Sequence, residues 1–208
     1  MKSSLSLFAQ VVQVIPRSVF ARAVRETSAA RNSKGFACWD QLVAMLFCHF
    51  AHSKSLREIS DGLAVTCGKL NHLGLLKAPA KSTLSYANAH RPWQLYQEIF
   101  QGLLSTYKSV SPGKKAKFRF KNPLLSLDAS VIELSLGLFP WAEFRQGKGA
   151  AKLHLLLDHD GYMPAFVDLT EGKLNDLKVA QNLQLPKGSI VALDRCYIDY
   201  GMFAKWTD

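Results

Sequence analysis

Ile190-Val191-Ala192-Leu193-Asp194-Arg195 is a short apolar run that leads into a carboxylate. A continuous hydrophobic run of this length predicts a strand inside a sheet that is covered on both faces. Ser126-Leu127-Asp128-Ala129-Ser130 has the same character earlier in the chain. A carboxylate at the end of a buried strand is costly to desolvate unless it meets a cation. The two runs therefore predict a metal site built on Asp128 and Asp194, with surface acids or local helix caps as the alternative.

The residues between these runs predict how the strands are connected. Apolar segments 152–158 and 162–169 flank Asp160-Gly161, and Asp-Gly between apolar runs is a strong hairpin signal. Asp158 and Asp160 are therefore interpreted as turn formers rather than ligands. A helix capped by Asn175-Asp176 follows, and a right-handed crossover then lets the last strand lie parallel beside the first. In that arrangement the two aspartates converge as hard oxygen ligands for Mg²⁺ or Mn²⁺.

Helical periodicity dominates the first 110 residues. Ser55 with Glu58 three residues later has the spacing of a capping box. Short helices joined by glycine turns, followed by a helix that opens Lys81-Ser82-Thr83, are compatible with a helix-turn-helix-like DNA reader. Lys81, Ser82, Thr83 and Arg91 are therefore candidate DNA contacts, with an ordinary bundle of short helices as the alternative. The predicted helices cover residues 4–15, 16–25, 39–50, short pieces of 54–76, 79–91 and 93–110.

Charge is divided unevenly along the chain. Residues 1–127 carry 18 Lys and Arg against 5 Asp and Glu, whereas residues 128–208 carry 8 against 11. A basic front half favours a polyanion such as nucleic acid, because Lys and Arg release its condensed counterions. A solvated basic face without a partner is the alternative. Between the halves, basic residues alternate with phenylalanines, which fits either a phosphate-tracking strand or protection of a sheet edge. These basic residues are Lys114, Lys115, Lys117 and Arg119.

The four cysteines form no C-x-x-C pair, which argues against a zinc knuckle or a redox motif and weakly favours a reducing cytoplasm. No run reaches 18 uninterrupted apolar residues, so no membrane partner is expected. The first 23 residues imitate a secretory signal superficially, but Gln10, Gln13 and Arg17 interrupt the pattern.

Several motifs in combination resemble bacterial insertion-sequence transposases of the DDE type, in the branch named insertion sequence four. In the second half they are Leu127-Asp128-Ala129-Ser130, Leu138-Phe139-Pro140-Trp141-Ala142, Lys152-Leu153-His154, Leu157-Asp158-His159-Asp160-Gly161-Tyr162, Thr170-Glu171-Gly172 and Leu193-Asp194-Arg195-Cys196-Tyr197. In the first half they include Ile15-Pro16-Arg17, Cys38-Trp39-Asp40-Gln41, Lys54-Ser55-Leu56-Arg57-Glu58-Ile59 and Ser82-Thr83-Leu84.

This resemblance implies a ribonuclease H-like catalytic domain in which Asp128 and Asp194 are the first two acids of a metal-binding triad. It also implies Mg²⁺ or Mn²⁺ as cofactor and the double-stranded DNA of element ends as partner, with Arg195 among the DNA contacts. Cys196 stands where the family usually has glycine, so strain is expected there if that position needs a positive φ. The family's third acid, a glutamate in a Tyr, Arg, Glu, Lys signature after Asp194, has no counterpart. A truncated, inactive or impaired form with a weakened second metal site is therefore expected.

The combined prediction is an α+β chain with an all-helical N-terminal domain and an incomplete ribonuclease H-like α/β domain. Its expected parts are a helical transposase-associated domain at 1–78, a helical DNA-binding or linker region at 79–113, and the partial catalytic domain at 114–208. The predicted function is transposition of an insertion sequence, in a cytoplasmic, nucleoid-associated protein that forms a homo-oligomer or a mixed assembly with an intact transposase. Two alternatives remain: a non-catalytic DNA-binding competitor, and a small cytosolic α/β protein whose basic front binds a protein.

Overall fold

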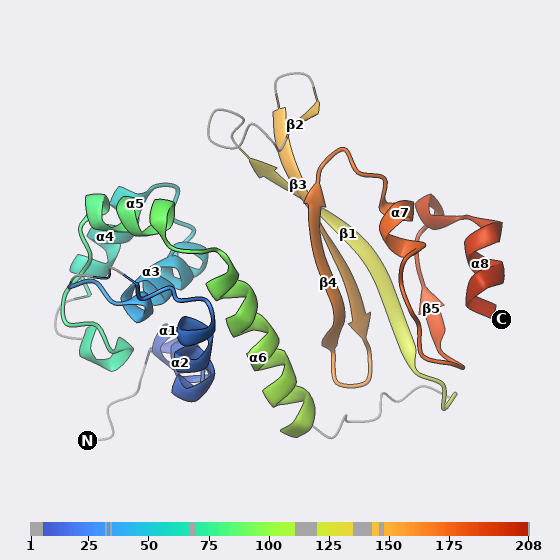
Figure 1. The fold of residues 1–208 in the computed structure, drawn as a ribbon, viewed down its shortest axis with the longest axis horizontal. Coiled ribbons are helices and arrows are strands. Elements are labelled where there is room, and N and C mark those ends of the chain that lie inside the picture. The colour runs from blue at the N-terminus through green and yellow to red at the C-terminus, as the bar shows by residue number, and fades with distance from the viewer. Residues whose placement is uncertain are drawn as a thin grey trace. The chain divides into compact units, whose positions relative to one another are not determined.

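The structure, a computed structural model, describes residues 6–31, 33, 35–66, 70–110, 120–134, 143–145 and 148–207. The chain forms two compact units, residues 1–106 and residues 107–208. Each unit has a hydrophobic cluster of its own. The class is α+β, as predicted, with a helical first unit and a mixed sheet in the second (Figure 1). The three-part division at residues 78 and 113 stays a prediction.

The first unit is built from amphipathic helices around α3. Trp39, Leu42, Val43 and Ala44 of this helix are buried in the core. Ser55 begins α4 as predicted, because its Oγ accepts a hydrogen bond from the Glu58 N–H at 3.2 Å. The elements are α1 (Leu7–Gln13), α2 (Arg17–Glu26), α3 (Cys38–Phe50), α4 (Leu56–Ala64), the 3₁₀ helix η1 (Leu70–Leu73), α5 (Lys81–His90) and α6 (Gln94–Val110), in agreement with the predicted helices.

The second unit is organised by a five-stranded mixed sheet. Its strands are β1 (Leu124–Leu134), β2 (Glu143–Arg145), β3 (Lys148–Asp158), β4 (Met163–Glu171) and β5 (Ile190–Ala192). Their order is β2-β3-β1-β5, and β4 also pairs with β3. The β3–β4 hairpin confirms the turn prediction: Asp158 Oδ1 accepts a hydrogen bond from the Asp160 N–H at 2.8 Å, and Gly161 has φ +103°. β5 runs parallel to β1 beside it, also as predicted.

One face of this sheet packs on short helices. Leu125 and Leu127 point into a cluster with residues of α7 (Asp176–Ala180), η3 (Arg195–Tyr197) and α8 (Tyr200–Thr207). The helix predicted after Asn175-Asp176 is short: α7 ends at Ala180, and the Leu183 N–H bonds to the Ala180 carbonyl in a tighter i to i−3 turn.

The prediction that the last strand is covered on both faces was wrong. β5 is an edge strand that leaves Ile190 40% exposed, since within the described residues helices cover only one of its faces. A short apolar run does not distinguish a central strand from an edge strand.

Within the described ranges, no single helix is long and apolar enough to cross a membrane. Taken together, α1 and α2 have the length and the composition of a membrane span, but the two helices are bent by 60° relative to each other.

Candidate functional site

The parallel pairing of β1 and β5 aligns the two predicted acids. Leu125 lies opposite Val191 and Ser126 opposite Ala192, where β5 ends. That register, continued by two residues, aligns Asp194 with Asp128, which lies within β1 and not at the end of its strand as predicted. Asp194 still has extended backbone, with φ −84° and ψ 177°. Because side chains alternate along a strand, both acids belong to the face opposite that of the buried Leu125. Both carboxylates are exposed.

Asp194 also begins the turn that follows β5. Its Oδ1 accepts a hydrogen bond from the Cys196 N–H at 2.8 Å. Hydrogen bonds from Cys196 hold the pKa of Asp194 below its ordinary value, so this carboxylate is ionised at neutral pH. The strain expected at Cys196 is absent, because among the described residues the non-glycine residues with positive φ are Ser28, His52 and Tyr162.

Tyr197 of η3 is buried in the hydrophobic cluster of the second unit. Its side chain is 1% exposed, and its hydroxyl has no hydrogen-bond partner among the described atoms. Burial raises the pKa of this phenol most, and the nearby charges of Asp176, Asp128 and Asp194 raise it further.

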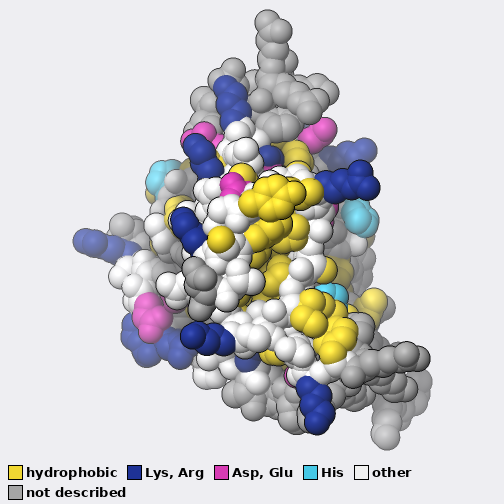
Figure 2. Space-filling view, turned by 90° about the vertical axis from the view of Figure 1, so that its right-hand side faces the viewer, with side chains coloured by type: hydrophobic (Ala, Val, Ile, Leu, Met, Phe, Trp, Pro, Cys, Tyr) yellow, Lys and Arg dark blue, Asp and Glu magenta, His cyan; other side chains and the backbone are white. Residues whose placement is uncertain are grey.

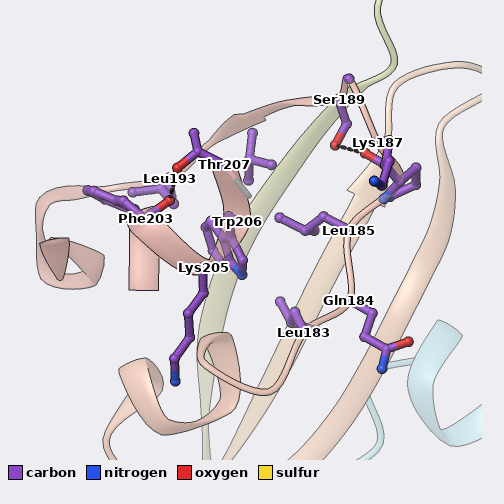
Figure 3. Close-up of a pocket in the computed structure, with 13 residues that line it drawn as sticks. Leu183, Gln184, Leu185, Lys187, Ser189, Leu193, Phe203, Lys205, Trp206 and Thr207 are labelled. Carbon is purple, nitrogen blue, oxygen red and sulfur yellow. Dashed lines mark hydrogen bonds between the residues drawn. The ribbon is translucent and has the colours of Figure 1, made fainter. Parts of the chain in front are cut away.

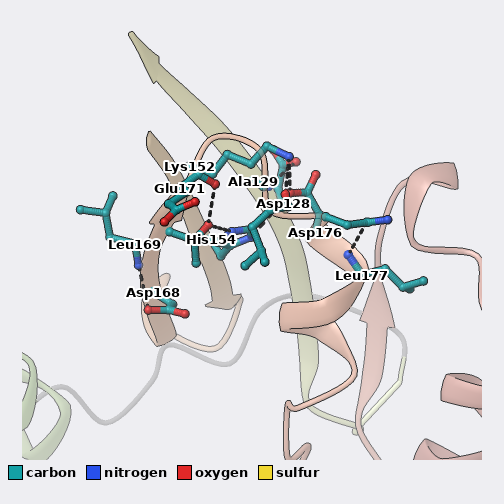
Figure 4. Close-up of polar contacts among 12 residues, drawn as sticks. Asp128, Ala129, Lys152, His154, Asp168, Leu169, Glu171, Asp176 and Leu177 are labelled. Carbon is teal, nitrogen blue, oxygen red and sulfur yellow. Dashed lines mark hydrogen bonds and ion pairs between the residues drawn. The ribbon is translucent and has the colours of Figure 1, made fainter. Parts of the chain in front are cut away.

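A second polar cluster lies on the helix-covered side of the sheet (Figure 4). Lys152 Nζ makes an ion pair of 2.8 Å with Asp176 Oδ1 and donates to the Leu174 carbonyl at 2.9 Å. His154 is fully buried, with Nε2 2.8 Å from Thr170 Oγ1 and Nδ1 4.0 Å from Asp176 Oδ1. Burial lowers the pKa of His154, and the charge of Asp176 opposes that shift. Lys152, His154 and Asp176 thus fasten β3 to α7.

Sequence reasoning did not assign a role to this cluster. One feature points to it: Lys152, His154 and Leu156 alternate on one face of a strand that is otherwise apolar. Asp176 is far away in the sequence, and its place opposite Lys152 depends on how α7 packs. The pairing is therefore a tertiary property that strand periodicity does not reveal.

The two aligned aspartates match the ligand chemistry of one hard cation, which takes oxygen ligands from carboxylates. Among the described residues, however, no group of three or more His, Cys, Asp or Glu side chains is placed to hold a metal ion. Asp199, which follows Asp194, is already used at the start of α8, where it accepts a hydrogen bond from the Met202 N–H at 2.6 Å. A pair of cations held as in two-metal sites has too few ligands in this part of the chain.

The predicted DNA contacts of the first unit gather on α5. Lys81 and Ser82 are exposed in its first turn, and no side chain caps that end of the helix. Ser82 and Thr83 line a pocket of about 560 Å³ together with Arg91. Uncapped N–H groups beside a lysine suit a phosphate. The first turn of α5 is thus a surface that a DNA backbone could occupy.

Arg91 is held within the protein. Its guanidinium donates to the carbonyl oxygens of Phe36 and Ala37, to Gln41 Oε1 at 3.0 Å and to Ser33 Oγ at 3.2 Å. All four acceptors are neutral, so the positive charge persists in the wall of the pocket. Of the other predicted contacts, Arg195 is exposed beside Asp194, whereas Lys114, Lys115, Lys117 and Arg119 lie outside the described residues.

The second unit also has an apolar groove of about 570 Å³ between α8, β5 and the segment before β5. Leu185, Phe203 and Trp206 line it (Figure 3). Figure 2, viewed from the side that carries α8, shows hydrophobic side chains gathered in a strip. None of the described residues that line the groove is acidic.

Comparison with known proteins adds similarity over parts of the chain. Residues 3–76 match a family model described as a domain of unknown function, DUF4372. A stretch of 130 residues is 27% identical to a Sinorhizobium fredii (strain NBRC 101917 / NGR234) protein named "Putative transposase y4zB", and covers 62% of this chain and 34% of that protein. The matched stretch therefore spans about a third of that relative's length. No solved structure matches the chain.

Proposed function

We propose that this chain is a DNA-binding protein of the DDE transposase type, in the insertion sequence four branch. Its second unit would be a ribonuclease H-like domain that carries two acids of the metal centre. One observation carries the proposal: the parallel pairing of β1 with β5, whose register, continued past Ala192, aligns Asp128 with Asp194. The similarity to a protein named as a transposase supports it.

The topology of the sheet supports the ribonuclease H-like assignment. Three long strands, β1, β3 and β4, run antiparallel in succession, and after α7 the chain returns as β5, parallel to β1. This is the order predicted from the sequence pattern, and in it β5 pairs with the first three residues of β1. The first acid lies within β1 and the second two residues after the end of β5.

The first unit would provide the contact with duplex DNA. Its surplus of positive charge gives sequence-independent attraction to phosphates, and α5 presents Lys81, Ser82 and Thr83 in one exposed turn. Arg91 acts indirectly here, because its hydrogen bonds hold Ser33 and Ala37 beside the end of α5. Arg195 would contact the backbone of DNA near the acids.

The metal chemistry would be incomplete in these residues. Asp128 and Asp194 would hold one Mg²⁺ or Mn²⁺, whose contribution is to activate or stabilise an oxygen at the reacting phosphate. A second ion would be bound poorly, because a further carboxylate is lacking in the described part of the chain. We therefore expect DNA binding with little or no strand cleavage.

Three measurements on the full chain test this proposal. Binding to a labelled duplex should weaken steeply as salt rises, since counterion release drives it. Mn²⁺, followed by its electron paramagnetic resonance signal, should bind at one weak site that is lost in Asp128→Asn but kept in the exposed turn variant Asp160→Asn. Supercoiled plasmid should remain uncut with Mg²⁺ or Mn²⁺.

The outcomes separate the parts of the proposal. Duplex affinity that does not depend on salt would refute the DNA-binding role. Mn²⁺ binding that survives Asp128→Asn would refute the metal site. Robust cutting that depends on Asp128 would refute the incomplete centre.

A second function, competition with an intact transposase, follows from the same incomplete set of acids. A chain that occupies element ends, or joins mixed oligomers, without cutting would reduce transposition. Co-expression with an intact relative should therefore lower the transposition frequency, and Lys81→Glu should relieve that inhibition. An unchanged frequency would exclude competition.

A further inference from the structure

The first unit contains a pocket whose shape and chemistry go beyond attraction to phosphates. It lies between α5 and the residues Arg31, Ser33 and Phe36, and has a volume of about 560 Å³. None of the described residues that line it is acidic. Arg31 is an exposed residue of its lining. Arg91 also lines the pocket, and because its hydrogen-bond acceptors are neutral its positive charge is not compensated by them. The pocket is therefore electropositive.

Two aromatic rings form a flat platform in this pocket. Tyr86 and His90 stack with their ring centroids 3.9 Å apart and their planes at 18°. A hydrogen bond of 2.8 Å between His90 Nδ1 and the Tyr86 carbonyl fixes the histidine ring. Since a carbonyl oxygen can only accept, His90 Nδ1 is the donor. The platform is thus pre-organised by its own helix.

Core packing does not account for this stack. Tyr86 is 66% exposed, whereas Leu84 and Ala87 of the same helix are buried and hold α5 on the unit. Nucleic-acid bases stack on exposed aromatic side chains, because every base has a π-face. Two arginines beside such a side chain can bind the phosphate of the same nucleotide. The hydroxyls of Ser82 and Thr83, in the same pocket, can hydrogen-bond to a base edge.

We propose that this pocket takes one unpaired nucleobase, stacked against the Tyr86–His90 platform, with the adjoining phosphate at Arg31. The inference rests on the proposed binding of DNA, and adds that the protein prefers DNA in which a base is unpaired or displaced. A paired base is not available to the platform, because both of its π-faces are already stacked in the duplex. The pocket would then recognise whether a base is unpaired, and not which base it is.

The test compares two labelled duplexes of one sequence, one fully paired and one in which a single 2-aminopurine lies opposite an abasic site. The full-length protein should bind the second duplex more tightly and quench the 2-aminopurine fluorescence. Tyr86→Ala should weaken that binding by about tenfold, in line with the loss of one stacked base, and should change affinity for the paired duplex by less than twofold. Tyr86→Phe should retain the preference, because the ring remains.

The controls keep this proposal distinct from the proposed function. Leu76→Ala, at an exposed apolar position outside the pocket lining, should leave both affinities unchanged. Salt-dependent binding to both duplexes with equal affinity and no quenching would overturn the base pocket while leaving DNA binding intact. Failure to bind either duplex would refute both. Circular dichroism of each variant shows whether the helical content has survived.

Discussion

Replacing Asp176 by asparagine should destabilise the second unit by about 2 kcal/mol. The carboxylate accepts a charged hydrogen bond from Lys152 at 2.8 Å, and the two side chains are 21% and 15% exposed. Exposed ion pairs contribute about 0.2–1 kcal/mol, whereas removing one partner of a fully buried pair costs about 3–5 kcal/mol. This pair lies between those limits, and asparagine retains an oxygen that can accept a weaker hydrogen bond. Loss of the negative charge also leaves the buried His154 without its opposing carboxylate.

Amide hydrogen exchange of β3 measures this effect within the second unit. A loss of about 2 kcal/mol corresponds to roughly thirtyfold faster exchange of the most protected amides. Asp160→Asn, which removes an exposed carboxylate from the β3–β4 turn, serves as the matched control and should leave exchange in the middle of β3 unchanged. A change of less than about 0.5 kcal/mol in Asp176→Asn would show that the pair contributes no more than an exposed salt bridge. The fastening of α7 to β3 would then have to come from apolar packing alone.

Three further changes test other features of the molecule. Burial holds the pKa of His154 below its ordinary value. The histidine of the unfolded chain therefore takes up a proton first as pH falls through about 6.5, and stability should decline below that pH. His154→Gln should reduce the difference between the free energies of unfolding at pH 7.5 and pH 5.5, and an unchanged difference would contradict this assignment. Burial, and then a hydrogen bond to Asp194, raise the pKa of the Cys196 thiol to about 11, so alkylation of Cys196 at pH 8, followed by mass spectrometry, should be slow and should accelerate in Asp194→Asn. In Gly102→Ala a new Cβ would lie 2.5 Å from Val19 Cγ1. The resulting overpacking between α6 and α2 should outweigh the gain in helix propensity and lower the free energy of unfolding in urea by about 1–2 kcal/mol. Adding Val19→Ala to this variant should recover most of the loss.

Local patterns predicted the elements and the alignment of the acids. Asp160-Gly161 placed the hairpin because its conformational demands are met by few residue types. The parallel pairing of the last strand with the first was also predicted, from the crossover rule. The prediction that Asp128 closes its strand was wrong, because β1 continues to Leu134. These inferences need only short-range rules and one rule of handedness.

The remainder depended on tertiary packing. The ion pair of Lys152 with Asp176 requires α7 to lie over β3, and no spacing in the sequence encodes that contact. Arg91 was predicted to contact DNA from its position in a helix, yet its guanidinium bonds to Ser33, Ala37 and Gln41, fifty or more positions earlier in the chain. Such side-chain contacts depend on segments that are distant in the sequence, and the hydrophobic periodicity of one segment does not predict them.

The two hydrophobic clusters share no residue: the buried members of one end at Ile99 and those of the other begin at Leu125. Heating should therefore produce two endotherms in calorimetry rather than one, each with its own midpoint and enthalpy. A substitution that melts the sheet would leave a half-folded chain that still presents α5. Such a species would keep any affinity for nucleic acid that belongs to the helical half.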